Sequence, residues 1–482
     1  MTSGCRWRLT PVDARLPFGC FSVTRSGSDA LLDFALASGM ADVKTTSLDA
    51  WLARYADAGT TAEQLDAGLR AAHAADAAGY RATWIPRLAK LERDRTSPLR
   101  EGVHPRRSDW EGLRLDLFWV YGFERIALEI DGAPFRRQRL LFSKPIKASE
   151  VAKVTKALGA APVLARLDEI DFTGNKLGDK GLVELCKSPH LGSLRALVLN
   201  SCGITDVGLK ALAATPLLAL ERLELSDNKL TAAGVKALVR SSLAATLRHL
   251  DIGANDVGAK GAQAIADAKL PKLEVLNASA CELGDAGLAK LLGSKTLPAL
   301  AELELHDNDL TKKTCAALAT TALPVRFLQL NGIAAGPEGA KQLAAAKLPK
   351  LVGLDLSGAK IGDAGAAALA GFKSKLACLY LSGNAITAAG AQALARSPAL
   401  KGLRDLNLDR NAIGDAGVAA LVESMRALER VWLENNGLTG AAVAELAKLP
   451  RLTDVELRGN KLGAAGDAAY DELKIKMRAR RG

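Results

Sequence analysis

Leucines recur along most of this chain in the order L-x-x-L-x-L, followed by a short turn and then apolar residues at helical spacing. The stretch LRDLNLDRNAIGDAG, from Leu403 to Gly417, shows the pattern clearly. Its first six positions alternate apolar and polar residues, which predicts a short strand with one buried side. The residues that follow, such as VAALVES, have the periodicity of a helix. Each unit therefore predicts a strand, a turn and a helix.

Twelve copies of this unit follow one another, with a mean period near 26 residues. They open at Leu167, Leu194, Leu220, Leu247, Leu273, Leu300, Val325, Leu351, Leu376, Leu403, Leu428 and Leu452. A unit of this length can bury its apolar side only by stacking on its neighbours. We therefore predict an α/β solenoid of about twelve repeats over residues 151–466. It should curve like a horseshoe, with the strands on the concave face and the helices outside.

The turn after each strand has its own chemistry. Asparagine occupies the ninth position in most copies, where a buried turn needs both a hydrogen-bond donor and an acceptor. Cys202 and Cys281 occupy the same position in two copies, and we expect them to be small buried substitutes. Threonine follows the turn in five copies and is expected to cap the helix; these are Thr205, Thr231, Thr311, Thr387 and Thr439.

The long helical repeat with G-D-x-G after the turn resembles the ribonuclease-inhibitor type of leucine-rich repeat, shared by ribonuclease inhibitor and the Ran GTPase-activating protein. The phrase G-A-A-A-L-A, at Gly365 to Ala370, is similar to the bacterial GALA-type repeat effectors. The lead-in FWVYGFERIALEI is similar to that of bacterial repeat proteins from myxobacteria and planctomycetes. These resemblances imply a horseshoe that binds protein partners, and a bacterial source.

The chain upstream of the repeats is long enough for one modest domain. Residues 1–45 are expected to be disordered or a non-native extension, with Met40 as an alternative start and a targeting role as a third reading. Residues 46–150 predict helices up to Leu91, a loop, and then a hairpin of strands at 113–117 and 123–130. A third strand is expected at 139–142. We expect this small α+β segment to cap the first repeat.

The other end of the chain is basic. Residues 467–482 end in KIKMRARR and are expected to form a cap or tail after the last repeat. The whole chain carries a net charge of +11, and lysines such as Lys180, Lys210 and Lys236 fall on the predicted helices. Seven scattered cysteines form no disulfide framework, which favours a reducing, cytoplasmic location. No apolar run approaches 18 residues, so we expect no membrane span and no membrane partner.

No motif for catalysis or cofactor binding is present. The sequence contains no phosphate-binding glycine loop, no H-E-x-x-H and no G-x-S-x-G. His249 and His306 would face the concavity about 10 Å apart, too far to share a zinc ion. We therefore expect a protein that is not an enzyme and holds neither cofactor nor metal.

The informative positions are those that the repeat does not dictate. One residue of each strand, between the two inner leucines, should face solvent on the concave side. These residues are Asp171, Val198, Glu224, Asp251, Asn277, Glu304, Gln329, Asp355, Tyr380, Asn407, Trp432 and Glu456. Six are acidic and none is basic, which disfavours nucleic acid in the concavity and favours a basic partner. The plainer alternative is a strand face that is merely soluble.

Aromatic and arginine residues gather on the C-terminal half of the same face, and these types are enriched at binding hot spots. We therefore expect a partner-binding surface composed of Asp171, Glu224, Asp251, Glu304, Phe327, Asp355, Tyr380, Arg404, Asp409, Arg430, Trp432 and Glu456. The main hypothesis is a monomeric interaction scaffold for a basic protein or peptide. The alternatives are a GALA-type adaptor that recruits a ubiquitin ligase or other machinery through its N-terminal domain, and a GTPase-activating protein.

Overall fold

The structure of this protein is a computed structural model that describes residues 114–116, 138–141, 151–160, 164–165, 167–321 and 323–481. The chain divides into two compact units. The larger comprises Met1–Cys5, Pro145–Gly159 and Phe172–Gly482, and the smaller comprises Arg6–Lys144 and Ala160–Asp171. The helices expected between residues 46 and 91 lie outside the described residues.

Three strands are described in the smaller unit. They are β1 (Arg114–Asp116), β2 (Gln138–Leu141) and β3 (Leu167–Asp171). All three run parallel, with β2 between β1 and β3. The strand expected at 139–142 is thus present. The strand expected at 113–117 pairs with β2 in parallel, while the second arm of the expected hairpin, 123–130, lies outside the described residues.

The larger unit repeats strand and helix without interruption, after an initial helix α8 (Val151–Ala160). Its strands are β4 (Ala196–Val198), β5 (Arg222–Glu224), β6 (His249–Asp251), β7 (Val275–Asn277), β8 (Glu302–Glu304), β9 (Phe327–Gln329), β10 (Gly353–Asp355), β11 (Cys378–Tyr380), β12 (Asp405–Asn407), β13 (Arg430–Trp432) and β14 (Asp454–Glu456). Each strand pairs in parallel with the next. The predicted α/β leucine-rich-repeat solenoid is confirmed.

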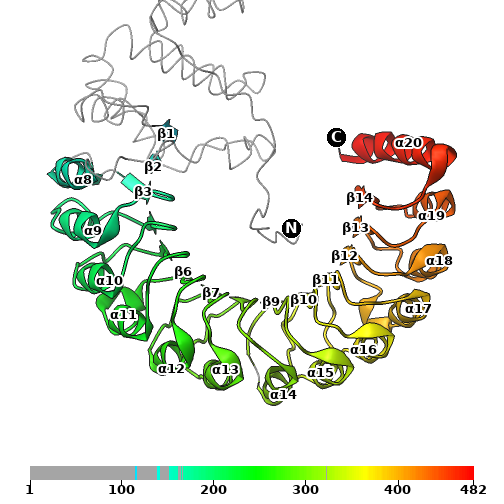
Figure 1. Cartoon of the computed structure of the whole chain (residues 1–482), viewed down its shortest axis with the longest axis horizontal. Coiled ribbons are helices and arrows are strands. Elements are labelled where there is room, and N and C mark those ends of the chain that lie inside the picture. The colour runs from blue at the N-terminus through cyan, green and yellow to red at the C-terminus, as the bar shows by residue number, and fades with distance from the viewer. Residues whose placement is uncertain are drawn as a thin grey trace, which may run out of the picture. The chain divides into compact units, whose positions relative to one another are not determined.

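A helix follows each strand from β3 onward. These helices are α9 (Gly178–Cys186), α10 (Asp206–Ala213), α11 (Ala232–Leu238), α12 (Gly258–Asp267), α13 (Gly284–Leu292), α14 (Lys312–Thr320), α15 (Gly336–Ala344), α16 (Gly362–Leu369), α17 (Ala388–Ala395), α18 (Gly414–Ser424), α19 (Gly440–Leu446) and α20 (Gly463–Arg481). Within the unit, the strands line the inner side of the curved row and the helices line the outer side (Figure 1).

The core is the stack of leucines that the repeat supplies. In most strands the middle residue is buried and its two neighbours are half-buried, as period-two alternation requires. Leu223, Leu250 and Leu276 are fully buried on successive strands. Neighbouring helices approach closely because a glycine replaces a larger residue at the contact. A Cβ at Gly287 would lie 2.7 Å from Ala259 Cα on the preceding helix.

The asparagines of the turns form a ladder of hydrogen bonds between repeats. Asn308 is buried, and its Oδ1 accepts from the backbone N–H groups of Cys281 (3.0 Å) and Leu283 (3.1 Å) in the preceding repeat. Its Nδ2 donates to the carbonyl of Ala278 at 2.7 Å and to that of Leu305 at 3.0 Å. The amide thus satisfies both donors and acceptors, as the sequence predicted.

Cys202 and Cys281 take the place of asparagine by a different arrangement. Both are buried, and the Cys281 thiol donates to the carbonyl of Ile252 at 3.1 Å. A thiol offers little as an acceptor for the N–H groups of the preceding repeat. There the backbone turns inward instead, so that the N–H of Val257 donates to the carbonyl of Asn255 two residues earlier (2.9 Å). The same inward turn, with Leu177 and Asn175, precedes Cys202.

Threonine caps and aspartates link the helices. Each of the five threonines accepts a hydrogen bond from the backbone N–H two residues later, so the predicted N-caps are confirmed. A carboxylate in the first turn of the preceding helix completes the link. Asp363 Oδ1 accepts from the N–H groups of Thr387 (2.7 Å) and Gly390 (3.0 Å), and its Oδ2 accepts from the Thr387 hydroxyl (2.6 Å).

Helix α20 covers the last repeat. Leu473 and Met477 are buried against the preceding elements, and the hydroxyl of Tyr470 donates to the carbonyl of Val455 at 2.8 Å. Arg480 Nη1 donates to the carbonyls of Leu449 and Leu452 at 3.1 and 3.0 Å. Most of the basic C-terminal stretch therefore continues one helix that packs on the solenoid.

Candidate protein-binding surface

The concave strand face is formed by the first and third residues of β4 to β14. Eight of these residues are acidic and two are arginines. The acids are Glu224, Asp251, Glu302, Glu304, Asp355, Asp405, Asp454 and Glu456, and the arginines are Arg222 and Arg430. The acidic excess expected from the sequence is therefore present on one continuous row of strands.

One cluster on the N-terminal half of this face is already internally paired. Glu224 forms an ion pair with Arg222, whose Nε donates to Oε1 at 2.8 Å, and it accepts from Asn200 Nδ2 at 2.9 Å. His249 Nε2 lies 3.7 Å from the same carboxylate. Burial opposes the charge of Glu224, but the Arg222 pair and these hydrogen bonds outweigh it and lower the pKa of Glu224.

Two of the expected partner-binding acids also hold the backbone turn after their strand. Asp251 Oδ1 accepts from the N–H of Gly253 at 2.9 Å, and Asp355 Oδ1 accepts from the N–H of Ser357 at 2.8 Å. Burial raises the pKa of Asp251 to about 6, and the nearby Glu224 charge adds to this shift. Burial likewise raises the pKa of Asp355. Asparagine performs the same turn role at Asn277, whose Oδ1 accepts from Ser279.

Tyr380 and Trp432 meet over the strand that separates them. Both are in register with Asn407 of β12, one strand to either side. Their ring centroids lie 5.9 Å apart at an interplanar angle of 83°, an edge-to-face pair. Burial raises the pKa of Tyr380, and the charge of Asp405 adds to that effect. The structure thus brings into contact two aromatic residues that the sequence analysis had placed together on the concave face.

Arg430 is held by a residue that sequence reasoning missed. Its guanidinium donates two hydrogen bonds to Asp405 on the neighbouring strand, one from Nε to Oδ1 at 2.6 Å and one from Nη2 to Oδ2. Asp405 is almost fully buried, and this bond raises the pKa of Arg430. The available signal was an Asp and an Arg at the same strand position of successive repeats, which parallel pairing places side by side.

The remaining expected residues are more dispersed. Phe327 begins β9, with the Arg326 guanidinium 5.8 Å from its ring centroid. Glu304 and Glu456 end β8 and β14. Arg404 and Asp409 lie just outside β12, at its two opposite ends; Arg404 pairs with Glu429 at 3.8 Å, and Asp409 accepts from the N–H of Glu434 at 2.7 Å. Asp171 ends β3 in the smaller unit.

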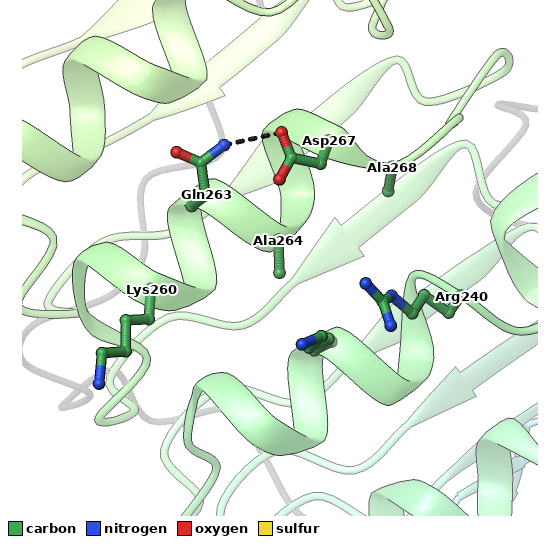
Figure 2. Close-up of a pocket in the computed structure, with 7 residues that line it drawn as sticks. Arg240, Lys260, Gln263, Ala264, Asp267 and Ala268 are labelled. Atoms are coloured by element: carbon green, nitrogen blue, oxygen red, sulfur yellow. Dashed lines mark hydrogen bonds between the residues drawn. The ribbon is translucent and has the colours of Figure 1, made fainter.

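A small groove of about 190 Å³ lies on the convex side between α11 and α12. Lys236, Arg240 and Lys260 line it, and Gln263 Nε2 donates to Asp267 at 2.7 Å. Lys260 points away from Arg240, so the cations do not converge on one point (Figure 2). Among the described residues, no cluster of His, Cys, Asp or Glu could hold a metal ion, and no helix could span a membrane.

Comparison with known proteins agrees with this architecture. The family model described as leucine-rich repeat matches residues 167–186, 190–213, 220–239, 244–266, 347–370, 373–395 and 403–422. The ribonuclease inhibitor of Sus scrofa is 30% identical over 341 residues, covering 65% of this chain and 68% of the inhibitor. The chain belongs to the ribonuclease-inhibitor-like family of leucine-rich-repeat proteins. Leucine-rich-repeat proteins of this kind generally act as protein-binding scaffolds and not as enzymes.

Other relatives of this ribonuclease-inhibitor-like chain share its repeats. The ribonuclease inhibitor of Mus musculus is also 30% identical, with coverage of 65% of this chain and 68% of the inhibitor. A solved structure described as the complex of Rad7 and Elc1 in yeast matches with a TM-score of 0.49 and 15% identity, covering 89% of this chain and 98% of that one.

Proposed function

We propose that this protein is a scaffold that captures a basic protein or peptide on its concave strand face. The observation that carries the proposal is the charge of that face, where eight carboxylates accompany only two arginines. Both arginines pair with carboxylates of the same face. Complementary charge accelerates association and selects the partner more than it adds affinity.

The aromatic pair of Tyr380 and Trp432 supplies the proposed anchor. Aromatic side chains dominate the energetics of many interfaces, and this pair is already fixed by edge-to-face packing, so little conformational entropy is lost on binding. The eleven strands of the larger unit span about 50 Å at the usual strand spacing. That length suits a partner footprint of roughly 800 Å².

Capture of partners from a cell lysate by the full chain, at low and high salt, tests this function. A quadruple variant, Glu302→Gln, Glu304→Gln, Asp454→Asn and Glu456→Gln, reduces the charge of the concave face. The matched control, Asp227→Asn, Asp256→Asn, Glu282→Gln and Asp309→Asn, makes the same charge change in the loops that follow the strands. Loss of a salt-sensitive partner in the first variant alone supports the proposal, and equal capture by both variants contradicts it.

The same capture tests the GALA-type adaptor. That alternative assigns recruitment to residues 46–150, so a chain lacking them would keep its repeat-bound target and lose the recruited machinery. The concave-face scaffold predicts unchanged capture of the basic partner by the shortened chain.

We further propose that the protein acts as a monomer in a reducing compartment such as the cytoplasm. The free thiols of Cys186, Cys202, Cys281 and Cys315 support this placement. Cys378 does not: it is disulfide-bonded in the structure, contrary to the expectation that no cysteine would pair.

A further inference from the structure

The basic charge of the larger unit is concentrated in one set of loops. Eleven connectors run from the end of each helix, α9 to α19, to the start of the next strand, and together they contain eighteen Lys and Arg residues but only three acids. The cations are Lys187, Arg195, Arg240, Arg248, Lys269, Lys272, Lys295, Arg326, Lys347, Lys350, Lys373, Lys375, Arg396, Lys401, Arg404, Arg426, Lys448 and Arg451. We call this surface the amino edge, because the strands begin there.

The three acids of the amino edge neutralise only three of its eighteen cations, because each is paired with one arginine. Glu221, Glu274 and Glu429 each pair with an arginine of the preceding connector, namely Arg195, Arg248 and Arg404. Lys187 and Lys448 pair with glutamates of their own helices. The other thirteen cations make no ion pair within the described part of the chain, and all thirteen are exposed.

The loops at the opposite ends of the strands are different. The loops that leave β3 to β14 and enter the next helix contain six Lys and Arg residues and seven acids. The positive charge therefore belongs to one edge, and not to the helices in general, where the sequence had placed it. Since the strands of the larger unit run parallel, all eleven connectors lie along the same edge of its sheet.

Helix dipoles explain only part of this pattern. A cation at the end of a helix interacts favourably with its carboxyl terminus, but the effect fades within one turn. The motif A-K-L-P-K/R-L, found at 268–273, 346–351 and 447–452, carries a second cation five or six residues beyond the helix end. In each copy both leucines are buried and both cations are exposed. The motif therefore anchors the connector and presents charge outward.

The amino edge also holds the most exposed large apolar side chain of the described residues. Leu218 is 68% exposed and lies in the connector between α10 and β5, the one connector without Lys or Arg. The only aromatic residue of the eleven connectors, Phe372, is buried. A nucleic-acid surface would ordinarily offer aromatic side chains for stacking on bases.

The shape of the amino edge also favours a planar partner over a nucleic-acid duplex. Figure 1 shows most helices of the larger unit close to end-on, so the connectors lie on one of its two broad sides and follow the curve of the unit. A planar surface can meet cations along the whole curve, whereas a rod-like duplex can follow only a short part of it. Lysine and arginine near an anionic leaflet are strongly attracted to it, and a bilayer can hold a protein that has no spanning helix.

We propose that the amino edge docks this protein on an anionic lipid bilayer, with the cations at the headgroups and Leu218 inserted between them. The concave face then stands upright on the membrane and stays open to its own partner. The docking site is separate from the concave acids, so its test is independent of the proposed scaffold function.

Sedimentation of the full chain with vesicles tests the proposal. Vesicles of 30% phosphatidylserine in phosphatidylcholine should bind it, with binding lost at high salt, and pure phosphatidylcholine should not. The variant Lys347→Gln, Lys350→Gln, Lys373→Gln and Lys375→Gln should bind the anionic vesicles at least about tenfold more weakly. The control Lys176→Gln, Lys229→Gln, Lys360→Gln and Lys461→Gln loses the same charge from the opposite edge and should bind as the native chain does.

The variant Leu218→Ser distinguishes insertion of the Leu218 side chain into the bilayer from electrostatic attraction of the cations to it. It should weaken vesicle binding and leave the dependence on salt unchanged, because no charge is lost. Equal weakening by the two quadruple variants, no binding to anionic vesicles, or unchanged binding of Leu218→Ser would overturn the proposal. A second result would also overturn it. If duplex DNA binds the native chain more tightly than the vesicles do, and the first quadruple variant loses this DNA binding, the edge is assigned to nucleic acid.

Discussion

Asp251 and Asn277 perform the same structural task with different side chains. Each accepts a backbone N–H two residues later and so fixes the turn after its strand. Asp251 also brings a charge into a site where burial raises its pKa to about 6. A residue that only held the turn could be asparagine, as it is on the next strand. The charge of the Asp251 carboxylate therefore lowers the stability of the fold, although the turn does not require a charge.

This comparison predicts that Asp251→Asn stabilises the protein. The folded state holds this proton more tightly than the unfolded chain, so the ionised carboxylate destabilises the fold fully above pH 6 and not at all below the unfolded pKa near 4. We expect a gain of about 1–2 kcal/mol at pH 7, after allowance for solvent screening, and none at pH 3.5. Urea unfolding at the two pH values measures it. An equal gain at both would contradict the pKa shift.

A second prediction concerns the asparagine ladder. Asn308→Ala removes a buried amide and leaves backbone groups of two repeats unsatisfied, which should cost about 2–4 kcal/mol. Asn460→Ala, in the last repeat, is the control; that amide is only part-buried and should cost less. Chemical denaturation of both variants measures the difference, and similar losses would mean that burial does not set the cost.

Residues of the ladder were predictable because their role follows from backbone chemistry that every repeat shares. The roles of the concave residues were only partly predictable. Their strand positions follow from alternation, but the Arg430–Asp405 pair depends on which residues become neighbours across strands. The turn role of Asp355 was likewise hidden, because an acid that faces solvent in a pattern can still bond its own backbone.

At the scale of the elements, the helices are linked by carboxylates. Asp285 and Asp363 each bridge to the threonine cap of the next helix. Burial raises their pKa slightly, but the hydrogen bonds outweigh it and lower the pKa of both. Every such bridge ties the start of one helix to the start of the next, so the bridges add to the stacking of leucines.

We predict that Asp363→Asn destabilises the protein by about 1 kcal/mol at pH 7, because the amide cannot accept the threonine hydroxyl as the carboxylate does. Since the folded pKa is depressed, the native contribution is present above about pH 4 and is lost as the pH falls through the folded pKa. Thermal unfolding should show a larger difference between the two proteins at pH 7 than at pH 2.5. A constant difference would exclude the ionised bridge.

At the scale of the whole molecule, the larger unit is held together by contacts between consecutive repeats. Helix α20 ends this series and buries Leu473 and Met477. In a stack of this kind, stability is close to a sum of repeats and their interfaces. Damage at one end should therefore remain near that end.

Removal of residues 463–482 tests this construction. We expect hydrogen-exchange protection to fall in β13, α19 and β14, and to remain unchanged in β5 to β8. The milder variant Arg480→Ala removes the two bonds to Leu449 and Leu452 and should show a smaller loss in the same elements. A uniform loss along the chain would mean that the unit unfolds as one cooperative block.

The solenoid was predictable from the sequence because the same local rule is repeated twelve times, and each repeat confirms the others. The smaller unit has no such repetition. The parallel pairing of β1 with β2 joins residues about two dozen positions apart, and the local alternation of leucines predicted the strand but not this partner. The amino edge was missed because its cations lie between the elements, where no periodic pattern draws attention to them.

The turns before Cys202 and Cys281 carry a consequence for how such a chain can be rearranged. A backbone turn whose N–H bonds its own carbonyl two residues earlier precedes Cys202, Cys281 and also Ala359, while the outward-facing N–H groups of Cys281 and Leu283 bond the amide of Asn308 in the next repeat. Each repeat is thus matched to its successor, and a junction between two repeats has a polarity of its own. Duplication or deletion of repeats during evolution, or in design, preserves these bonds only where the two halves of a junction are inherited together.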